Sequence, residues 1–549
     1  MLFILALFAV LSAGCLSAQT ADLVIENATI HTGLTTQPQA SFLAIKGSRI
    51  LYVGDPKPDL IGTSTRRLNL QGAAVFPGFI DSHVHLAGLG EMLDSLNLRG
   101  LDSIERVASL VRQAAANRPA GEWIRGRAWD QTNWGGQFPT AEAISAAAPK
   151  HPTYLTRVDG HAAWANRAAM ELAGITRDTA DPPGGKVIRD AKGNPTGVFI
   201  DRAMGLLTTR IPARTPDQVE RYLRAGALEC ARLGLTGVHD AGVSSEEISA
   251  YRRLIARKQL PVRVYAMIRG AGELWREYLE RGPEIGDHLT VRSIKLVADG
   301  AMGSRGAALH APYSDDGDNR GLLMLTKEQI EQVAREAVRR GFQVNTHAIG
   351  DRANSITLDA YAAALGGPND QRFRIEHAQI VRPSDFGLFR KLSVIASIQS
   401  THATSDMRWA NVRLGPNRID GAWAAKTFLI NNVRIANGSD FPVEEADPLL
   451  GFYAAVTRTD HKGQPSGGFR PEEKLSRYEA LKSWTLDGAF AAFEETFKGT
   501  LESGKLADVV VLSANILSVP PQEILNARVL YTILGGEIVY ARPGGQNTR

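Results

Sequence analysis

Eight short apolar runs, separated by longer intervals, occupy the middle of this chain of 549 residues. The runs lie at 74–80, 236–239, 262–268, 291–298, 343–346, 373–375, 393–398 and 433–436. Most of the intervals have a helical pattern, for example 217–233, 327–340, 352–365 and 422–431. Strands that alternate with helices form parallel sheets, and eight such strands fit a (β/α)8 barrel better than an open, doubly wound sheet. The sequence therefore predicts an α/β fold with a TIM-like barrel over 74–498.

The two ends of the chain have a different pattern. Short strand-like runs fill 22–75, with a hairpin turn at KGSR, and again 507–540, with a hairpin turn at GG. We expect 19–73 and 499–545 to form one small β-sandwich domain. The interval between the first two barrel strands, about 98–217, is too long for a crossover connection and predicts an inserted subdomain.

The composition excludes several classes of protein. Hydrophobic residues make up 44% of the chain and charged residues 22%, which are globular values. The formal net charge is +4, and so small an excess predicts no nucleic-acid partner. Two cysteines cannot build a disulfide framework.

The first 18 residues contain no charged side chain, and the apolar run 2–11 is followed by small residues. This pattern is typical of a signal peptide cleaved after Ala18, which predicts export to the periplasm or the cell exterior. Two alternatives stay open: a membrane-anchored lipoprotein with its lipid on Cys15 in the sequence SAGC, and an uncleaved anchor helix. No later run is long enough to span a bilayer.

Polar residues stand at the ends of several predicted barrel strands, where barrel enzymes carry their catalytic groups. They are His83 and His85 on strand one, Lys295 on strand four, His347 on strand five, His377 on strand six and Asp440 on strand eight. Side chains two residues apart on a strand point to the same side, so the His-x-His pair has a good geometry for one metal ion. Imidazole and carboxylate ligands suit Zn²⁺.

Each of these residues also has a structural explanation. A His-x-His pair can be a surface feature, and a single buried histidine is often hydrogen-bonded in the core. Lys295 can extend its amine from a strand end to water, and Asp440 can cap a helix. The joint order of ligand-type residues on five of the predicted strands is harder to explain in this way and favours a metal site.

This order, with the motifs PGFIDSHVH, THAIGD, IEHA and GSD, resembles the amidohydrolase superfamily. The long insertion after the first strand and the segment KLVADGAMGSR resemble its amidohydrolase family 3 branch, that of the N-substituted formamide deformylases. The resemblance covers about 23–540, including a terminal β domain with the strand GKLADVVVL. It implies one or two divalent metal ions, with Zn²⁺ expected: His83 and His85 would bind the more buried ion, and His347 and His377 the second.

The resemblance also implies special roles for two residues. Lys295 would be carboxylated by CO₂ and bridge both ions, which requires a neutral amine of lowered pKa. Asp440 would contact the buried ion and act as the general base. The implied reaction is the hydrolysis of a non-peptide C–N bond by metal-activated hydroxide, for example in an N-substituted formamide or another N-acyl compound.

Other functions stay open at this point. The same site could hydrolyse a lactone, a carbamate or a cyclic amide, or the chain could be an inactive metal- or ligand-binding protein. The presence of Lys295 and Asp440 argues against an inactive protein, because mere binding needs neither a bridge nor a base.

The expected partner is a small-molecule substrate, and the oligomeric state stays open, with a homodimer as one option. Two residues are candidates for binding this substrate. Arg305 follows strand four and could bind an anionic group, with a structural ion pair as the alternative. His161, in the insertion, could line the pocket, with a structural hydrogen bond as the alternative.

Overall fold

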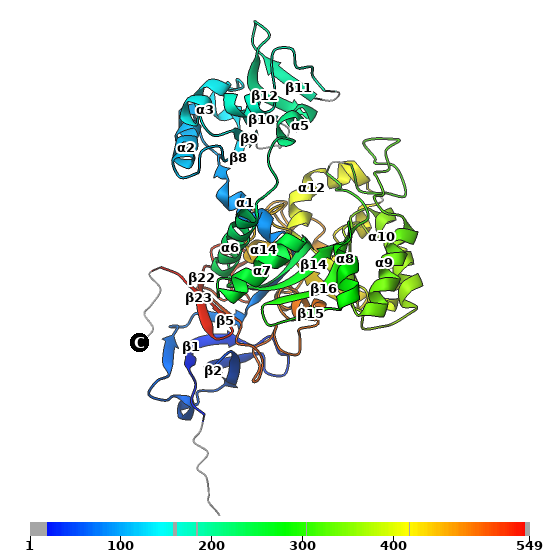
Figure 1. The fold of residues 1–549 in the computed structure, drawn as a ribbon. Helices are drawn as coiled ribbons and strands as arrows, with labels where there is room; N and C mark the ends of the chain where they lie inside the picture. Colours follow the sequence, from blue (N-terminus) through cyan, green and yellow to red (C-terminus); the bar gives the residue numbers. More distant parts are fainter. Residues whose placement is uncertain (1–18, 158–161, 183–184, 304, 417, 544–549) are drawn as a thin grey trace, which may run out of the picture. The chain divides into compact units, whose positions relative to one another are not determined.

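The computed structural model describes residues 19–157, 162–182, 185–303, 305–416 and 418–543 (Figure 1). The predicted signal peptide, with Cys15 and Ala18, lies outside the described residues, and so does His161. The chain divides into two compact units: Met1–Val84, Cys230–Gly242 and Pro261–Arg549 form the first, and His85–Glu229 with Val243–Leu260 form the second. Within the described ranges, no helix combines the length and the apolar character needed to cross a membrane.

The predicted TIM-like barrel is confirmed. Its eight strands follow one another in space in the same order as in the sequence. They are β6 (Phe79–Val84), β13 (Leu235–Val243), β14 (Arg263–Arg269), β16 (Leu289–Val297), β17 (Gln343–Ala348), β18 (Arg374–His377), β19 (Ile395–Ile398) and β20 (Ile435–Asn437). The pairing is parallel along this order, and a two-residue strand, β15 (Glu284–Ile285), pairs antiparallel with β16. At the seam between the two ends of the order, the Asp440 N–H donates to the His83 carbonyl at 2.8 Å.

Helices of the first unit surround these strands. They include α8 (Leu274–Arg281), α9 (Lys327–Arg340), α10 (Asp351–Leu365), α11 (Phe386–Lys391), α12 (Ser400–Leu414), α13 (Ala425–Ile430), α14 (Pro448–Thr457), α15 (Arg477–Ser483), α16 (Leu486–Ala491) and α17 (Pro521–Ile524). Helix α9 has the bounds that the sequence predicts, because Thr326 and Gln329 form a capping box at its start and Gly341, at a φ of 72°, ends it.

The apolar run 74–80 differs from the expectation of one strand. It is divided at Gly78 into β5 (Ala74–Pro77) and β6, and β5 leaves the barrel to pair with β1 (Leu23–His31) and β21 (Val509–Leu512). A Cβ atom on Gly78 would lie 2.2–2.8 Å from atoms of the Thr236 side chain, so the chain passes β13 closely only because this residue is glycine.

Strands from both ends of the chain form one sheet, in the order β23-β22-β21-β5-β1-β2-β3, with β4 beside β1. The members not yet given are β2 (Gln39–Lys46), β3 (Arg49–Gly54), β4 (Arg66–Asn69), β22 (Val529–Leu534) and β23 (Glu537–Ala541). Apolar side chains from both termini, such as Ile25, Leu43, Val75 and Val509, share a single buried cluster. The joining of the two ends therefore follows from hydrophobic burial, and packing as a sandwich stays a prediction.

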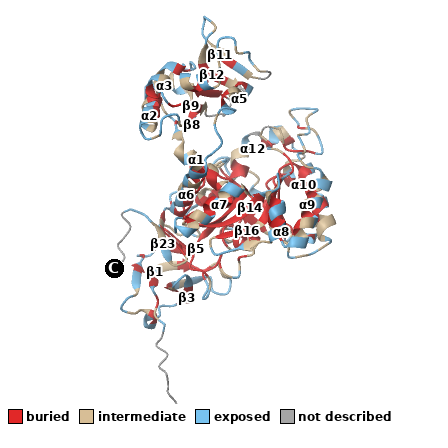
Figure 2. Ribbon diagram, viewed as in Figure 1, coloured by how far each residue is buried: buried red, intermediate tan, exposed pale blue. Residues whose placement is uncertain are grey.

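The second unit contains a sheet of its own, in the order β11-β12-β10-β9-β8-β7. Its elements are α1 (Leu86–Asp94), β7 (Leu96–Asn97), α2 (Ile104–Ala116), β8 (Ile124–Trp129), α3 (Ala141–Ala147), β9 (Thr153–Arg157), β10 (Ala162–Ala165), α4 (Arg167–Leu172), β11 (Gly185–Arg189), β12 (Pro195–Asp201), α5 (Gly205–Thr208), α6 (Pro216–Arg232) and α7 (Ser245–Ala256). Trp129 and Trp164 are fully buried and belong to one hydrophobic cluster of this unit. Figure 2 shows the buried residues of the unit in red. These two rings therefore pack the insertion itself.

Candidate metal centre

Five of the predicted ligands converge at the carboxyl ends of the barrel strands. The Lys295 Nζ of β16 lies 3.1 Å from the His83 Nε2 of β6, and this Nε2 lies 3.7 Å from Asp440 Oδ1. The ring of His377 on β18 lies 4.9 Å from that of His83 and 4.4 Å from that of His347 on β17, measured between centroids. Parallel strands end at one edge, so residues far apart in the sequence meet there.

The sixth predicted ligand, His85, directly precedes α1. His83, His85 and Asp440 form a group in which each offers a ligand atom, and these atoms lie within 4.8 Å of one another. Three donors at this spacing match one ion with imidazole and carboxylate ligands. The structure thus brings the predicted residues together, and their assignment as ligands stays a prediction.

A buried carboxylate holds Asp440 against the first strand. Asp81 accepts hydrogen bonds from the Ser439 N–H at 3.0 Å and the Ser439 hydroxyl at 2.6 Å. Burial raises the pKa of Asp81 to about 7, and the Ser439 bonds oppose the rise. The residue before Ser439, Gly438, must be glycine, because a Cβ atom there would lie 2.7 Å from the backbone nitrogen of His83. Asp440 itself has a φ of 63°, which is strained for a residue with a side chain and typical of functional sites.

Glu376 orients the His83 ring. Its Oε2 lies 2.5 Å from His83 Nδ1, and its Oε1 lies 2.8 Å from Arg374 Nε, with both acid and base fully buried. Burial would raise the pKa of Glu376, but Arg374 and His83 hold it well below its usual value. An ionised carboxylate on Nδ1 keeps the proton there and leaves the Nε2 lone pair for a metal, as in metal sites generally. The sequence analysis did not assign Glu376; its signal was a charged pair, Arg374 and Glu376, inside a buried strand.

His377 is oriented in a similar way. Its Nδ1 lies 2.7 Å from the Gln399 side-chain oxygen, an acceptor that fixes the proton on Nδ1. Burial lowers the pKa of His377 well below its usual value, and the neighbouring His347 lowers it further. The His377 imidazole is therefore neutral at pH 7, which is the form that binds a metal.

Lys295 has the environment that a carboxylated lysine needs. It is 7% exposed, and burial lowers the pKa of its ammonium to about 8, against the opposing effect of Glu376 and Asp440. A fraction of the amine is therefore neutral at pH 7, and only a neutral amine reacts with CO₂. The environment fits the predicted modification, which stays a prediction.

One further histidine belongs to the cluster. His402, in the first turn of α12, forms a second candidate ligand group with His377 and Asp440. Its Nε2 lies 3.7 Å from Asp440 Oδ2 and, like the His347 Nε2, is buried with no hydrogen-bond partner among the described residues. Buried imidazole nitrogens without partners fit a site for a cation ligated by nitrogen. The sequence signal was the polar QSTH segment after β19, a strand to which the sequence analysis assigned no ligand.

A cavity adjoins the centre on the side of His402. It is lined by His377, Gln379, Gln399, His402, Trp423 and Arg458. The predicted substrate-binding residue Arg305 is not among its lining residues. Arg305 Nη2 instead pairs with Asp315 Oδ2 at 2.9 Å, which matches the structural alternative.

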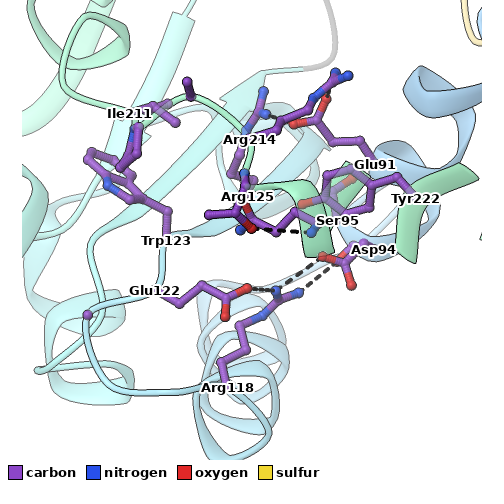
Figure 3. Close-up of a pocket in the computed structure, with 15 residues that line it drawn as sticks. Glu91, Asp94, Ser95, Arg118, Glu122, Trp123, Arg125, Ile211, Arg214 and Tyr222 are labelled. Atoms are coloured by element: carbon purple, nitrogen blue, oxygen red, sulfur yellow. Dashed lines mark hydrogen bonds and ion pairs between the residues drawn. The ribbon is translucent and has the colours of Figure 1, made fainter. Parts of the chain in front are cut away.

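A second cavity lies within the second unit (Figure 3). Its arginines are paired with acids: Arg118 Nη1 lies 3.2 Å from Asp94 Oδ2, and Arg125 and Arg214 both pair with Glu91. Among the described residues, no histidine lines this cavity. The charges of its described lining residues are paired, and these residues include none of the imidazole ligands found at the barrel site.

A barrel whose strand ends gather histidines, a lysine and an aspartate defines the class of metal-dependent hydrolases, and comparison with known proteins specifies the family. Residues 67–540 match the Amidohydrolase family, and the chain belongs to it. The predicted membership of the amidohydrolase family 3 branch is confirmed. The prediction of an enzyme that hydrolyses carbon–nitrogen bonds other than peptide bonds is confirmed as well.

Three similar proteins illustrate this membership. Protein LONG AFTER FAR-RED 3 of Arabidopsis thaliana is 35% identical, over 95% of this chain and 92% of its own length. An N-substituted formamide deformylase of Arthrobacter pascens is 28% identical, over 96% and 99%. The crystal structure of a metal-dependent hydrolase from Pyrococcus horikoshii is 28% identical, with a TM-score of 0.76 over 91% of this chain and 99% of that one.

Proposed function

We propose that the chain hydrolyses an amide of a small molecule, releasing a carboxylic acid and an amine. The observation that carries the proposal is the convergence of His83, His377 and Asp440 beside a cavity at the carboxyl ends of the strands. The name of the Arthrobacter pascens relative, an N-substituted formamide deformylase, makes N-acyl and N-formyl amides the first compounds to test.

The residues of the chain fit this reaction. A divalent ion at the centre, with Zn²⁺ as the expected metal, would polarise the carbonyl and make a water molecule acidic. Asp440 takes the proton from that water and returns it to the leaving nitrogen. Lys295, if carboxylated, would place a negative charge among the histidines and could serve as a ligand of a second ion.

Substrate turnover and metal content together test the proposal. The full chain, purified with its metals, is assayed against N-formyl, N-acetyl, carbamate, cyclic-amide and lactone compounds, and its metals are counted by elemental analysis. We expect turnover of an amide, its loss on chelation and its return with Zn²⁺. Asp440→Asn keeps the shape of the side chain but removes the base, so we expect turnover to fall by about 10²–10⁴-fold.

Several results would contradict the proposal. Turnover of lactones alone would assign the site to a different bond. Metal binding without turnover of any compound would favour the alternative of an inactive binding protein. An Asp440→Asn variant within a few-fold of the wild-type rate would show that Asp440 is not the base.

We also propose that the protein is exported. The support is the uncharged, apolar sequence of residues 1–18. The mass of the N-terminal peptide of the native protein tests this: a start at Gln19 shows cleavage and secretion, and a lipid on Cys15 shows an anchored lipoprotein. An intact Met1 would contradict both forms of processing.

A further inference from the structure

The cavity beside the metal centre contains one buried cation, Arg458. This residue follows the last turn of α14, has a φ of 60° and is 2% exposed. It lines the same cavity as His377 and His402. Arg458 therefore shares a cavity with two residues of the candidate metal centre.

The guanidinium of Arg458 is poorly satisfied by the protein. Its Nε donates to the Phe469 carbonyl at 3.0 Å. Its Nη2 is buried and has no hydrogen-bond partner, and no carboxylate within the described part of the chain forms an ion pair with it. A guanidinium carries five N–H donors in a planar fork, so the single backbone bond leaves most of its capacity unused.

The nearby acid Glu473 is already engaged. Its Oε2 accepts from the backbone N–H groups of Lys426 at 2.8 Å and Thr427 at 3.0 Å, and its Oε1 accepts from the Thr427 hydroxyl at 2.6 Å. It also pairs with Arg470 at 3.5 Å. These four interactions bind the Glu473 carboxylate to α13 and to Arg470. Both of its oxygens are therefore engaged by groups other than Arg458.

Arg458 keeps its charge in this environment. Burial lowers the pKa of its guanidinium to about 10, which is still above physiological pH. The guanidinium carbon also lies 5.9 Å from the centroid of the Phe469 ring, a cation–π contact that provides no hydrogen-bond acceptor for the N–H groups. A buried charge without a carboxylate partner is costly, and proteins normally pair it. Arg263 illustrates the usual case, because its side chain is buried and its Nε lies 2.8 Å from Asp508 Oδ2.

We propose that Arg458 binds a carboxylate of the substrate, so that the substrate class is amides that carry a carboxylate beyond the scissile bond. This inference rests on the proposed function, since it names the substrate class of the same site. The Arg458 fork matches the two oxygens of a carboxylate. A carboxylate bound to Arg458 would position the scissile amide of the substrate at the metal centre.

Matched pairs of substrates test this inference. Wild-type enzyme, Arg458→Gln and Arg458→Lys are assayed on N-acyl amino acids and on the same compounds with the carboxylate converted to a neutral amide. Wild type should prefer the carboxylate member of a pair by about tenfold or more in kcat/KM. Arg458→Gln should lower kcat/KM on the carboxylate by about 10- to 100-fold, mainly through KM, and change the neutral member by only a few-fold. Arg458→Lys should retain part of the preference.

The control is Arg382→Gln, which removes an arginine that pairs with Asp385 outside the cavity. It should leave the preference for the carboxylate unchanged. Equal wild-type kcat/KM on both members of every pair would overturn the inference and leave the proposed function standing. Equal losses on both members in Arg458→Gln would assign Arg458 a structural role and also overturn it. If Arg458→Gln does not fold, wild type and Arg458→Lys still decide the question.

Failure of the proposed function has a different signature. If no amide of either set is hydrolysed, calorimetric titration of the metal-loaded chain with both sets decides about Arg458 alone. Binding of the carboxylates but not of their neutral partners, lost in Arg458→Gln, supports the anion site. Equal binding of both sets, or no binding of either, overturns it.

Discussion

At the scale of single residues, burial shifts the pKa values of the side chains that form the candidate centre. Lys295 shows this most clearly, since an ordinary lysine is a cation and would repel a dication. Burial lowers the pKa of its amine to about 8, and its Nζ lies 3.1 Å from the His83 Nε2. Its place among the histidines is explained if the amine becomes a carbamate, which inverts the sign of its charge.

Removal of Lys295 tests this explanation. Lys295→Ala should bind at most one metal ion tightly and lose more than about 100-fold in activity, because the bridge is absent. Short carboxylic acids should partly restore the activity by filling the vacated position. Elemental analysis and an acid-rescue assay measure both effects. Two tightly bound ions in the variant, with no response to added acids, would contradict a bridging carbamate.

At the scale of elements, β18 combines a candidate ligand at its end with supporting residues further inside the barrel. On β18, His377 lies at the candidate centre. Glu376 contacts His83, and Arg374 contacts His239. His239 on β13 is a neutral acceptor: its Nδ1 lies 2.9 Å from Arg374 Nη1. Burial lowers the pKa of His239 well below its usual value, and Arg374 lowers it further.

A dependence of stability on pH follows for β13. Below about pH 6.5 the unfolded chain protonates His239 and the folded chain does not, so this residue favours unfolding as the pH falls. His239→Gln keeps an acceptor that does not titrate. The unfolding free energy of the wild type, relative to the variant, should therefore fall by about 2 kcal/mol between pH 7 and pH 5. Urea unfolding of both metal-free proteins measures this difference, and a difference that is constant with pH would refute a neutral His239.

At the scale of the whole molecule, the candidate metal site lies where the two ends of the strand order meet. β6 and β20 are the first and last strands of the barrel, and the Asp440 N–H to His83 carbonyl bond links them. The candidate ligands His83 and Asp440 come from these two ends, so a bound ion would tie the seam together.

Metal should therefore stabilise the folded chain as well as activate it. An ion present at about 1,000 times its dissociation constant adds about 4 kcal/mol to the unfolding free energy. We expect chelation to lower the melting temperature and Zn²⁺ to restore it, as measured by calorimetry. In Asp440→Asn the restoration should be smaller. An identical melting temperature with and without metal would show that the ion makes no contribution to the fold.

Much of this architecture was predictable from the sequence, because its signals are local. Buried parallel strands are short apolar runs, and their ends are marked by the polar residues that follow, as at His347 and Asp440. These patterns indicated the barrel, the joining of both termini and the candidate ligands. The run 74–80 was predicted as one strand because it is uniformly apolar, whereas the structure divides it at Gly78, where the chain passes close to Thr236, more than 150 residues away.

The tertiary structure alone decided which polar groups are satisfied. Glu376 supports His83 across 293 residues of sequence, and Asp81 holds Ser439 across 358. The sequence does not distinguish Arg305 from Arg458. In the structure, Arg305 pairs with Asp315, whereas Arg458 is buried beside the candidate centre and forms no ion pair with a carboxylate of the described residues. The reason is physical: the energy of a charge depends on its burial and on its partners, and both are set by segments that only folding brings together.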